Sequence, residues 1–318
     1  MTDETTVGQV ADAVSGNWVD HWAPEASRPF LRLSRADRPI GTWLLFIPCL
    51  WGLGAASLMQ GHFTAGHAWI AIGCAIGAWL MRGAGCTWND ITDRKIDAKV
   101  ARTQSRPIPS GQVSVAGATA WMIIQSFLAF LILSTFNWQA LWLGVASLAL
   151  VGVYPFAKRF TWWPQIFLGL AFNWGVFLAW TAAAGSISWA AVSIYVGGVF
   201  WTLFYDTIYA HQDTEDDALI GIKSTARLFG EDTVKWLKWF IVISVLFFAT
   251  GLIGALAPNV NVLQLVLALG GVWFFGWHLA WQLRQLDIDR PDICLRLFRS
   301  NRNAGFIPLL FFAFAHFA

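Results

Sequence analysis

Long apolar segments recur along almost the whole chain, and they restrict its fold more than any other feature. They extend from Ile40 almost to Ala318 with short polar breaks, and only 13% of the 318 residues are charged, whereas soluble domains carry about 25% charged residues. A transmembrane helix needs about 20 mainly apolar residues. We therefore predict an all-α, polytopic membrane protein with about nine transmembrane helices, at residues 40–59, 66–88, 113–135, 138–156, 163–183, 187–207, 234–257, 260–281 and 303–318.

The charged residues of this predicted arrangement lie on one side of the membrane. Basic residues precede the first segment and follow the second, fourth, sixth and eighth, Arg82 lies toward the same end of the second, and every Asp and Glu shares that side. The turns near Gly61, Asn137, Gly185 and Pro258 contain no Lys, Arg, Asp or Glu. Because short loops rich in Lys and Arg stay on the inner side, we predict a cytoplasmic N-terminus. A site for a charged substrate should open on the cytoplasmic side.

The N-terminal residues carry no targeting signal that we can identify. They are acidic, and they lack the basic and apolar regions of a signal peptide and the Arg-rich character of a transit peptide. We therefore expect residues 1–30 to form a cytoplasmic segment, residues 31–318 to form one membrane domain, and the chain to lie in a bacterial inner membrane as a multi-pass protein. A trimmed protein of the mitochondrial inner membrane remains an alternative. The cysteines are scattered, with no CxxC pair, and are interpreted as small buried hydrophobes: Cys49, Cys74, Cys86 and Cys294.

A first acidic cluster, GCTWNDITDRKIDAKV, stands at the cytoplasmic end of the second segment. On a helix, Asn89, Asp93 and Asp97 share one face, and Asp90 lies beside it. Like charges at this spacing repel one another, and an unpaired carboxylate at a membrane boundary is costlier still. A bound cation would offset that cost.

A second acidic cluster, FYDTIYAHQDTEDDALIGIKSTARLFG, follows the sixth segment. Steps of seven and four residues keep Asp206, Asp213 and Asp217 on one helical face, and Tyr209 comes three residues after Asp206. One such cluster would most simply be a set of solvated loop charges. Two clusters, at matching ends of the second and sixth helices, suggest two four-helix halves whose acidic ends face each other.

Oxygen ligands of this kind predict a hard cation bound together with phosphate. Mg²⁺ typically takes one or two carboxylates, several waters and substrate phosphates, so a diphosphate is the expected remaining ligand. Basic side chains near the clusters could neutralise the rest of its charge. These include Lys95, Arg102, Lys158, Arg159 and Lys223.

Five sequence motifs resemble the UbiA superfamily of intramembrane prenyltransferases over nearly the whole chain. They are DRPIGTWLL from Asp37, NDITDRKID from Asn89, SRPIPSG from Ser105, YPFAKRFT from Tyr154, and YDTIYAHQDTEDDALIGIKSTARLFG from Tyr205. The last motif is similar to the hydroxybenzoate branch of the superfamily. The resemblance implies helices around a central cavity that opens to the cytoplasmic side and laterally to lipid.

The resemblance also implies a reaction and a set of site residues. A polyprenyl group would pass from a polyprenyl diphosphate to the ring carbon ortho to the hydroxyl of 4-hydroxybenzoate, a step of ubiquinone biosynthesis, with no nucleic-acid partner and with membrane lipid around the chain. Arg159 matches a position important for activity, and either Arg38 or Arg159 would bind the acceptor carboxylate. Magnesium and the diphosphate would be held by Asn89, Asp93, Asp97, Asp213 and Asp217, with Asp90 and Asp206 in support.

Two other functions stay open at this point. A prenyltransferase of the same superfamily could use another aromatic acceptor. A cation-coupled transporter also carries internal repeats and intramembrane carboxylates, but it places its ions near the membrane midplane, whereas the acidic residues here lie at one face. The sequence therefore favours an enzyme.

Overall fold

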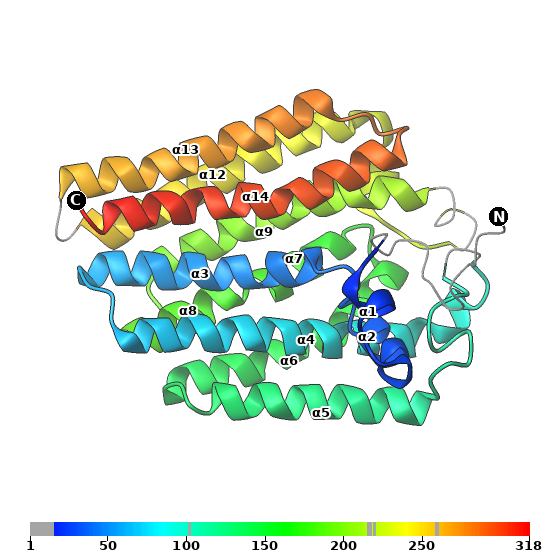
Figure 1. Ribbon diagram of the computed structural model, residues 1–318. Helices are drawn as coiled ribbons and strands as arrows, with labels where there is room; N and C mark the ends of the chain where they lie inside the picture. Colours follow the sequence, from blue (N-terminus) through cyan, green and yellow to red (C-terminus); the bar gives the residue numbers. More distant parts are fainter. Residues whose placement is uncertain (1–15, 101–102, 215–217, 219–220, 258–260) are drawn as a thin grey trace. The chain divides into compact units, whose positions relative to one another are not determined.

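The computed structural model describes residues 16–100, 103–214, 218, 221–257 and 261–318, and no strand occurs among them (Figure 1). This confirms the all-helical prediction. The N-terminal part contains two short helices. The remaining helices are α3 (Ile40–Gln60), α4 (Ala65–Asp97), α5 (Val115–Leu133), α6 (Trp138–Phe160), α7 (Pro164–Asn173), α8 (Gly175–Ala184), α9 (Trp189–Ala210), α11 (Thr225–Phe229), α12 (Thr233–Leu256), α13 (Val262–Gln285) and α14 (Pro291–Ala315), and the two short ones are α1 (Trp18–His21) and α2 (Arg28–Leu33).

Eight helical segments of the described chain are long and apolar enough to cross a membrane. They correspond to the first eight predicted spans, with α7 and α8 together forming one of them. The ninth prediction, residues 303–318, covers only the second half of α14, because α14 begins at Pro291 and carries basic residues in its first half. The membrane class is therefore confirmed, with a helix number close to the expected nine.

Helix α4 is longer than predicted and includes the first acidic cluster. It contains 33 residues and ends at Asp97, nine residues beyond the predicted end at residue 88. The helix continues because each added residue makes one further backbone hydrogen bond, and none of the residues from 89 to 97 is Gly or Pro. The acidic residues are thus held on a regular helix.

The chain divides into two compact units. One unit consists of Met1–Trp43 and Ile76–Ile132, and the other of Leu44–Ala75 and Leu133–Ala318. We call them the first and the second unit. The expected division at residue 30 differs from this one and falls within α2; it stays a prediction.

The first unit joins α1 and α2 to the acidic half of α4 and to α5. A small apolar core contains Leu33, Ile91, Val113 and Ala118. Ser34 Oγ donates to Gln125 Oε1 of α5 at 3.0 Å. The segment between α2 and α3 is therefore held against α5.

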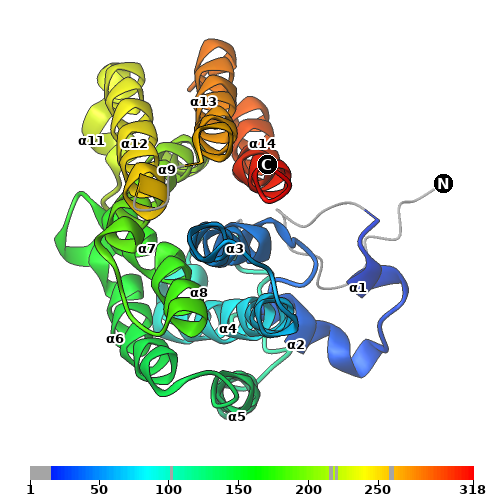
Figure 2. The ribbon, with the colours of Figure 1, turned by 90° about the vertical axis from the view of Figure 1, so that its left-hand side faces the viewer.

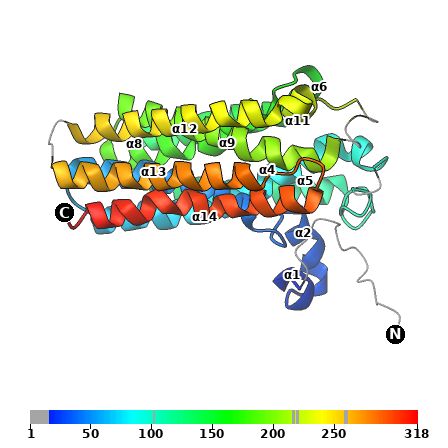
Figure 3. The ribbon, with the colours of Figure 1, turned by 90° about the horizontal axis from the view of Figure 1, so that it is seen from above.

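The second unit is organised around α9, which packs against α7, α12 and α14 (Figure 2). Its core is aromatic: the ring centroids of Trp51 and Trp201 lie 4.8 Å apart, and those of Trp51 and Phe248 lie 4.7 Å apart. The indole nitrogen of Trp201 donates to Asn301 Oδ1 of α14 at 2.9 Å. Helices α13 and α14 lie side by side (Figure 3). A buried hydrogen bond thus connects α9 to α14. Such bonds help to hold membrane helices together, because lipid tails are as apolar as the side chains and leave no hydrophobic driving force between helices.

Helices α9 and α12 approach each other closely at two glycines. A Cβ atom added to Gly197 would lie 2.9 Å from the backbone oxygen of Ser244, and one added to Gly251 would lie 2.8 Å from that of Ala190. Small residues allow this kind of backbone approach between membrane helices.

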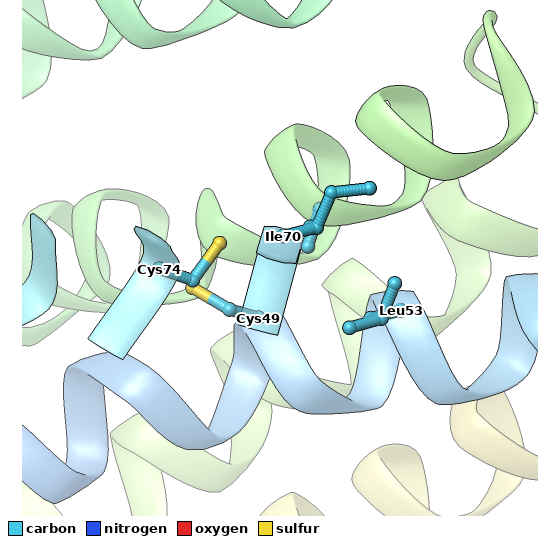
Figure 4. Packing of buried hydrophobic residues seen from close by; sticks show 5 residues of the cluster. Cys49, Leu53, Ile70 and Cys74 are labelled. Carbon is cyan, nitrogen blue, oxygen red and sulfur yellow. The ribbon is translucent and has the colours of Figure 1, made fainter. Parts of the chain in front are cut away.

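The cysteines are buried, as predicted. Cys49 and Cys74 lie with Leu53, Ile70 and Ala179 in one buried cluster of the second unit (Figure 4). All four cysteines of the chain are buried and carry free thiols.

Candidate active site

The end of α4 presents the first acidic cluster as a buried stripe. The side chains of Asn89, Asp93 and Asp97 follow at helical spacing on one face, which confirms the expected arrangement. The exposed fractions are 0% for Asp90, 1% for Asp93 and 6% for Asp97. Three carboxylates buried this deeply need nearby positive charge.

Two arginines of the first unit supply part of that charge. Arg35 Nη2 lies 2.6 Å from Asp90 Oδ1. Arg106 Nη1 lies 2.8 Å from Asp97 Oδ2 and 3.5 Å from Asp90 Oδ1. The other oxygen of Asp90 has no hydrogen-bond partner among the described residues. Two guanidinium groups thus lie against the carboxylates of Asp90 and Asp97.

Arg38 also lies in the first unit, and its guanidinium is already engaged. Its Nε and Nη2 atoms donate to the two carboxylate oxygens of Asp37 at 3.1 and 3.3 Å. Burial raises the pKa of Asp37 to about 6, although the nearby Arg35 lowers it. The acceptor-binding role of Arg38 stays a prediction. In that role the Arg38 guanidinium would contact both the acceptor carboxylate and the carboxylate of Asp37.

The raised pKa of Asp37 predicts a pH dependence of stability. Between about pH 4 and pH 6 the folded chain binds a proton that the unfolded chain has released, so the contribution of this group falls as the pH rises through that window. Asp37→Asn removes this dependence, and its thermal midpoint relative to the unchanged protein should therefore rise from pH 4 to pH 7. Asp292→Asn is the control and should show an almost flat difference over this range, because Arg290 lowers the pKa of Asp292 and its titration falls below about pH 4. A flat difference for Asp37→Asn would contradict the prediction.

The second acidic cluster begins on α9 and continues beyond it. Asp206 and Tyr209 are half-buried, and the ring of Tyr209 lies 4.4 Å from that of Phe298 on α14. Asp213 ends a 3-10 helix, His211–Asp213. Because three residues make one 3-10 turn, Asp213 is turned further about the helix axis than a continuous α-helix would place it, and the shared face expected for Asp206 and Asp213 stays a prediction. Asp217 lies outside the described residues.

The candidate basic residues fall into two groups. Lys95 is exposed at the end of α4, and Arg102 lies outside the described residues. In the second unit, the backbone N–H of Lys223 donates to the backbone oxygen of Lys158 at 3.1 Å, so two candidate phosphate contacts are neighbours. Arg159 is exposed, and its guanidinium lies 5.1 Å from the ring centre of Phe156.

The donor set fits magnesium, although it forms no complete cage. Within the part of the chain that the structure describes, no three His, Cys, Asp or Glu side chains gather closely enough to hold one ion. The α4 face carries the side-chain oxygens of Asn89, Asp93 and Asp97, and Mg²⁺ usually completes its octahedron with water and substrate phosphate. The two acidic clusters belong to different units, so their facing each other stays a prediction.

Sequence reasoning did not identify the role of Arg35. It appeared only as one of the basic residues before the first helix, whereas the structure pairs it with Asp90, 55 positions away. The residue also has a φ of +56°, the only positive φ of a non-glycine residue in the described ranges. No spacing pattern in the sequence indicates either property.

A comparison with protein-family models identifies the chain. The model of the UbiA prenyltransferase family matches residues 45–317. The chain belongs to the UbiA prenyltransferase family. The resemblance stated above is thereby confirmed.

Curated relatives of this UbiA chain carry a consistent name. The chain is 47% identical over 290 residues to "4-hydroxybenzoate polyprenyltransferase, mitochondrial" of Bos taurus, covering 91% of this chain and 75% of that protein. It is 46% identical over 290 residues to the protein of the same name from Homo sapiens, again covering 91% and 75%.

Solved structures confirm the UbiA fold. The apo structure of a UbiA homolog from Aeropyrum pernix K1 matches with a TM-score of 0.69 at 23% identity, covering 84% of this chain and 96% of that one. The structure of a UbiA homolog from Archaeoglobus fulgidus bound to GPP and Mg²⁺ matches with a TM-score of 0.68 at 20% identity, covering 90% and 98%.

The expected bacterial inner membrane is wrong for this UbiA chain. The relatives reported above are named as mitochondrial proteins of eukaryotes, which indicates a mitochondrial membrane. The error has a physical reason: basic loops mark the inner side of a membrane, but they do not say to which cell or organelle that membrane belongs.

Proposed function

We propose that this protein transfers a polyprenyl group from a polyprenyl diphosphate to the ring carbon ortho to the hydroxyl of 4-hydroxybenzoate, with Mg²⁺ as cofactor, in a mitochondrial membrane. The observation that carries the proposal is 47% identity, over 91% of the chain, to a relative named for this reaction. The reaction is a step of ubiquinone biosynthesis. The oxygen-only face at the end of α4 supports the metal requirement.

Asn89, Asp93 and Asp97 would hold the metal on the first unit, with Asp213 and Asp217 as the corresponding ligands on the second. Bound magnesium would supply Lewis-acid stabilisation of the departing diphosphate. Phosphate oxygens that do not contact the metal would be neutralised by basic side chains, namely Lys95, Arg102, Lys158 and Lys223. These side chains therefore bind and orient the charged end of the substrate.

The helices would have a second task, which is to exclude water. An allylic carbocation reacts with water, so the prenyl group must meet the acceptor ring in a dry environment. The helices that are long and apolar enough to cross a membrane would provide this environment. Arg159 would bind the acceptor carboxylate, with Arg38 as the alternative, and Tyr209 would contact substrate beside Asp206.

The test uses the purified protein in lipid vesicles with a polyprenyl diphosphate, labelled 4-hydroxybenzoate and Mg²⁺. We expect label in the lipid extract, and we expect EDTA to abolish it because the diphosphate loses its metal-assisted departure. Restoration by excess Mg²⁺ controls for other effects of the chelator. Absence of labelled lipid with every chain length tried, or product formation only with a different aromatic acceptor, would overturn the proposed reaction.

A further inference from the structure

Arg35 combines three properties that rarely occur together. Its backbone lies in the left-handed region, with a φ of +56°, its side chain is 8% exposed, and its partner Asp90 is 0% exposed. A non-glycine residue in this conformation is strained and persists only when its surroundings impose it; such residues cluster at functional sites.

Several bonds of the first unit hold Arg35 in place. Its Nη1 atom donates to the backbone oxygen of Arg32 at 3.1 Å, while Nη2 donates to Asp90 Oδ1 at 2.6 Å. The preceding Ser34 accepts a bond of 2.8 Å from the indole nitrogen of Trp121 on α5. Arg35 therefore extends from a segment anchored on α5 to the acidic end of α4.

The pairing of Arg35 with Asp90 affects the direction in which the acidic face of α4 points. Successive residues of an α-helix are about 100° apart, so Asp90 lies to one side of both Asn89 and Asp93, about 100° from the first and about 60° from the second. Fixing Asp90 to Arg35 fixes the rotation of this part of α4 about its axis. The oxygens of Asn89 and Asp93 then point in one defined direction.

We propose that Arg35 is a positioning residue for the reaction: its pairing with Asp90 fixes the rotation of α4 that presents Asn89 and Asp93 to the metal, and Asp90 is the counter-ion of Arg35 rather than a metal ligand. The inference rests on the proposed function, since it concerns the magnesium site. Outer partners that orient ligands typically affect metal affinity by about 10–100-fold when they are removed.

The test measures binding of Mn²⁺, as a spectroscopic substitute for Mg²⁺, to the full chain in lipid nanodiscs without substrate, by electron paramagnetic resonance of the free ion. Arg35→Gln should weaken Mn²⁺ binding at least about tenfold. Simple electrostatics predicts the opposite, because losing a positive charge makes the site more negative. Arg35→Lys, which keeps the charge without the planar fork, should show an intermediate loss and replaces Arg35→Gln if that variant does not fold.

A buried ion pair of the same unit provides the matched control. Arg32 Nη2 lies 2.7 Å from Asp20 Oδ1, and both side chains are 5% exposed. Arg32→Gln should lower the thermal midpoint as Arg35→Gln does, yet leave Mn²⁺ affinity unchanged. If both variants lose the same Mn²⁺ affinity, the effect of Arg35→Gln comes only from lower stability of the fold, and the proposal is overturned.

The double variant Arg35→Gln with Asp90→Asn decides the role of Asp90. The two new amide side chains can hydrogen-bond to each other in place of the ion pair. The affinity for Mn²⁺ should therefore recover to within about threefold of that of the unchanged protein. If the double variant binds as weakly as Asp90→Asn alone, then Asp90 is a ligand and the proposal is wrong; unchanged or tighter binding by Arg35→Gln also overturns it. Mn²⁺ binding without prenyl transfer by the unchanged protein would refute the proposed reaction and leave this test standing.

Discussion

Asp93→Ala is expected to lower the rate of prenyl transfer by at least about 10²-fold while the protein still inserts into the membrane. Asp93 lies on the buried face of α4 with Asn89 and Asp97, and its exposed fraction is 1%. The substitution removes a charge intended for the metal and very little apolar surface. Initial rates with labelled 4-hydroxybenzoate measure the effect, and gel filtration in detergent checks that the variant remains folded.

Two further variants make this result decisive. Asp213→Ala should produce a similar loss, because the second cluster supplies the opposite ligands in the proposed site. Asp292→Ala should keep its activity, because that carboxylate is exposed and pairs with Arg290 at the surface. Full activity in both Asp93→Ala and Asp213→Ala would refute the hypothesis of two metal-binding clusters.

Gly251→Ala is expected to destabilise the protein by about 1–3 kcal/mol. The new Cβ would lie 2.8 Å from the backbone oxygen of Ala190 and 3.0 Å from the backbone nitrogen of Ile194. Backbone atoms cannot move aside as a flexible side chain can, so α9 and α12 must separate. Unfolding in mixed detergent micelles, followed by circular dichroism, measures the loss.

Gly254→Ala, on the same helix, is the matched control. Its added Cβ would meet only the Cβ of Ala190, at 3.8 Å, which is an ordinary contact. Alanine is favoured over glycine within a helix by about 1 kcal/mol, so this variant should be as stable as the unchanged protein or more stable. If Gly251→Ala and Gly254→Ala behave alike, close packing of α9 on α12 does not contribute to stability.

The membrane helices could be predicted because a single requirement, a long apolar stretch, determines them. The same requirement explains the errors. Hydropathy falls at Asn89 and Asp90, so it placed the end of the second helix at residue 88, but backbone hydrogen bonding continues to Asp97. The span predicted at residues 163–183 is confirmed, but hydropathy did not reveal that it consists of two helices, α7 and α8, which meet at Trp174.

The candidate site was only partly predictable for a different reason. Spacing along a helix indicates which residues share a face, so the α4 stripe was found. It does not indicate partners that are distant in sequence, such as Arg35 and Asp90, or the change from an α-helix to a 3-10 helix before Asp213. Those features depend on tertiary packing, which local periodicity does not encode.

The length of α4 has a consequence for where the substrate is held. Its 33 residues extend about 50 Å at 1.5 Å per residue, whereas the hydrocarbon layer is about 30 Å thick. A helix that crosses this layer therefore extends well beyond it, and the buried carboxylates lie at the extended end. A prenyl diphosphate has the same division, with a tail soluble in hydrocarbon and a head soluble in water. In the proposed site, the diphosphate head would thus meet the carboxylates at the membrane boundary while the tail stays in hydrocarbon, and the substrate would not need to leave the bilayer to react.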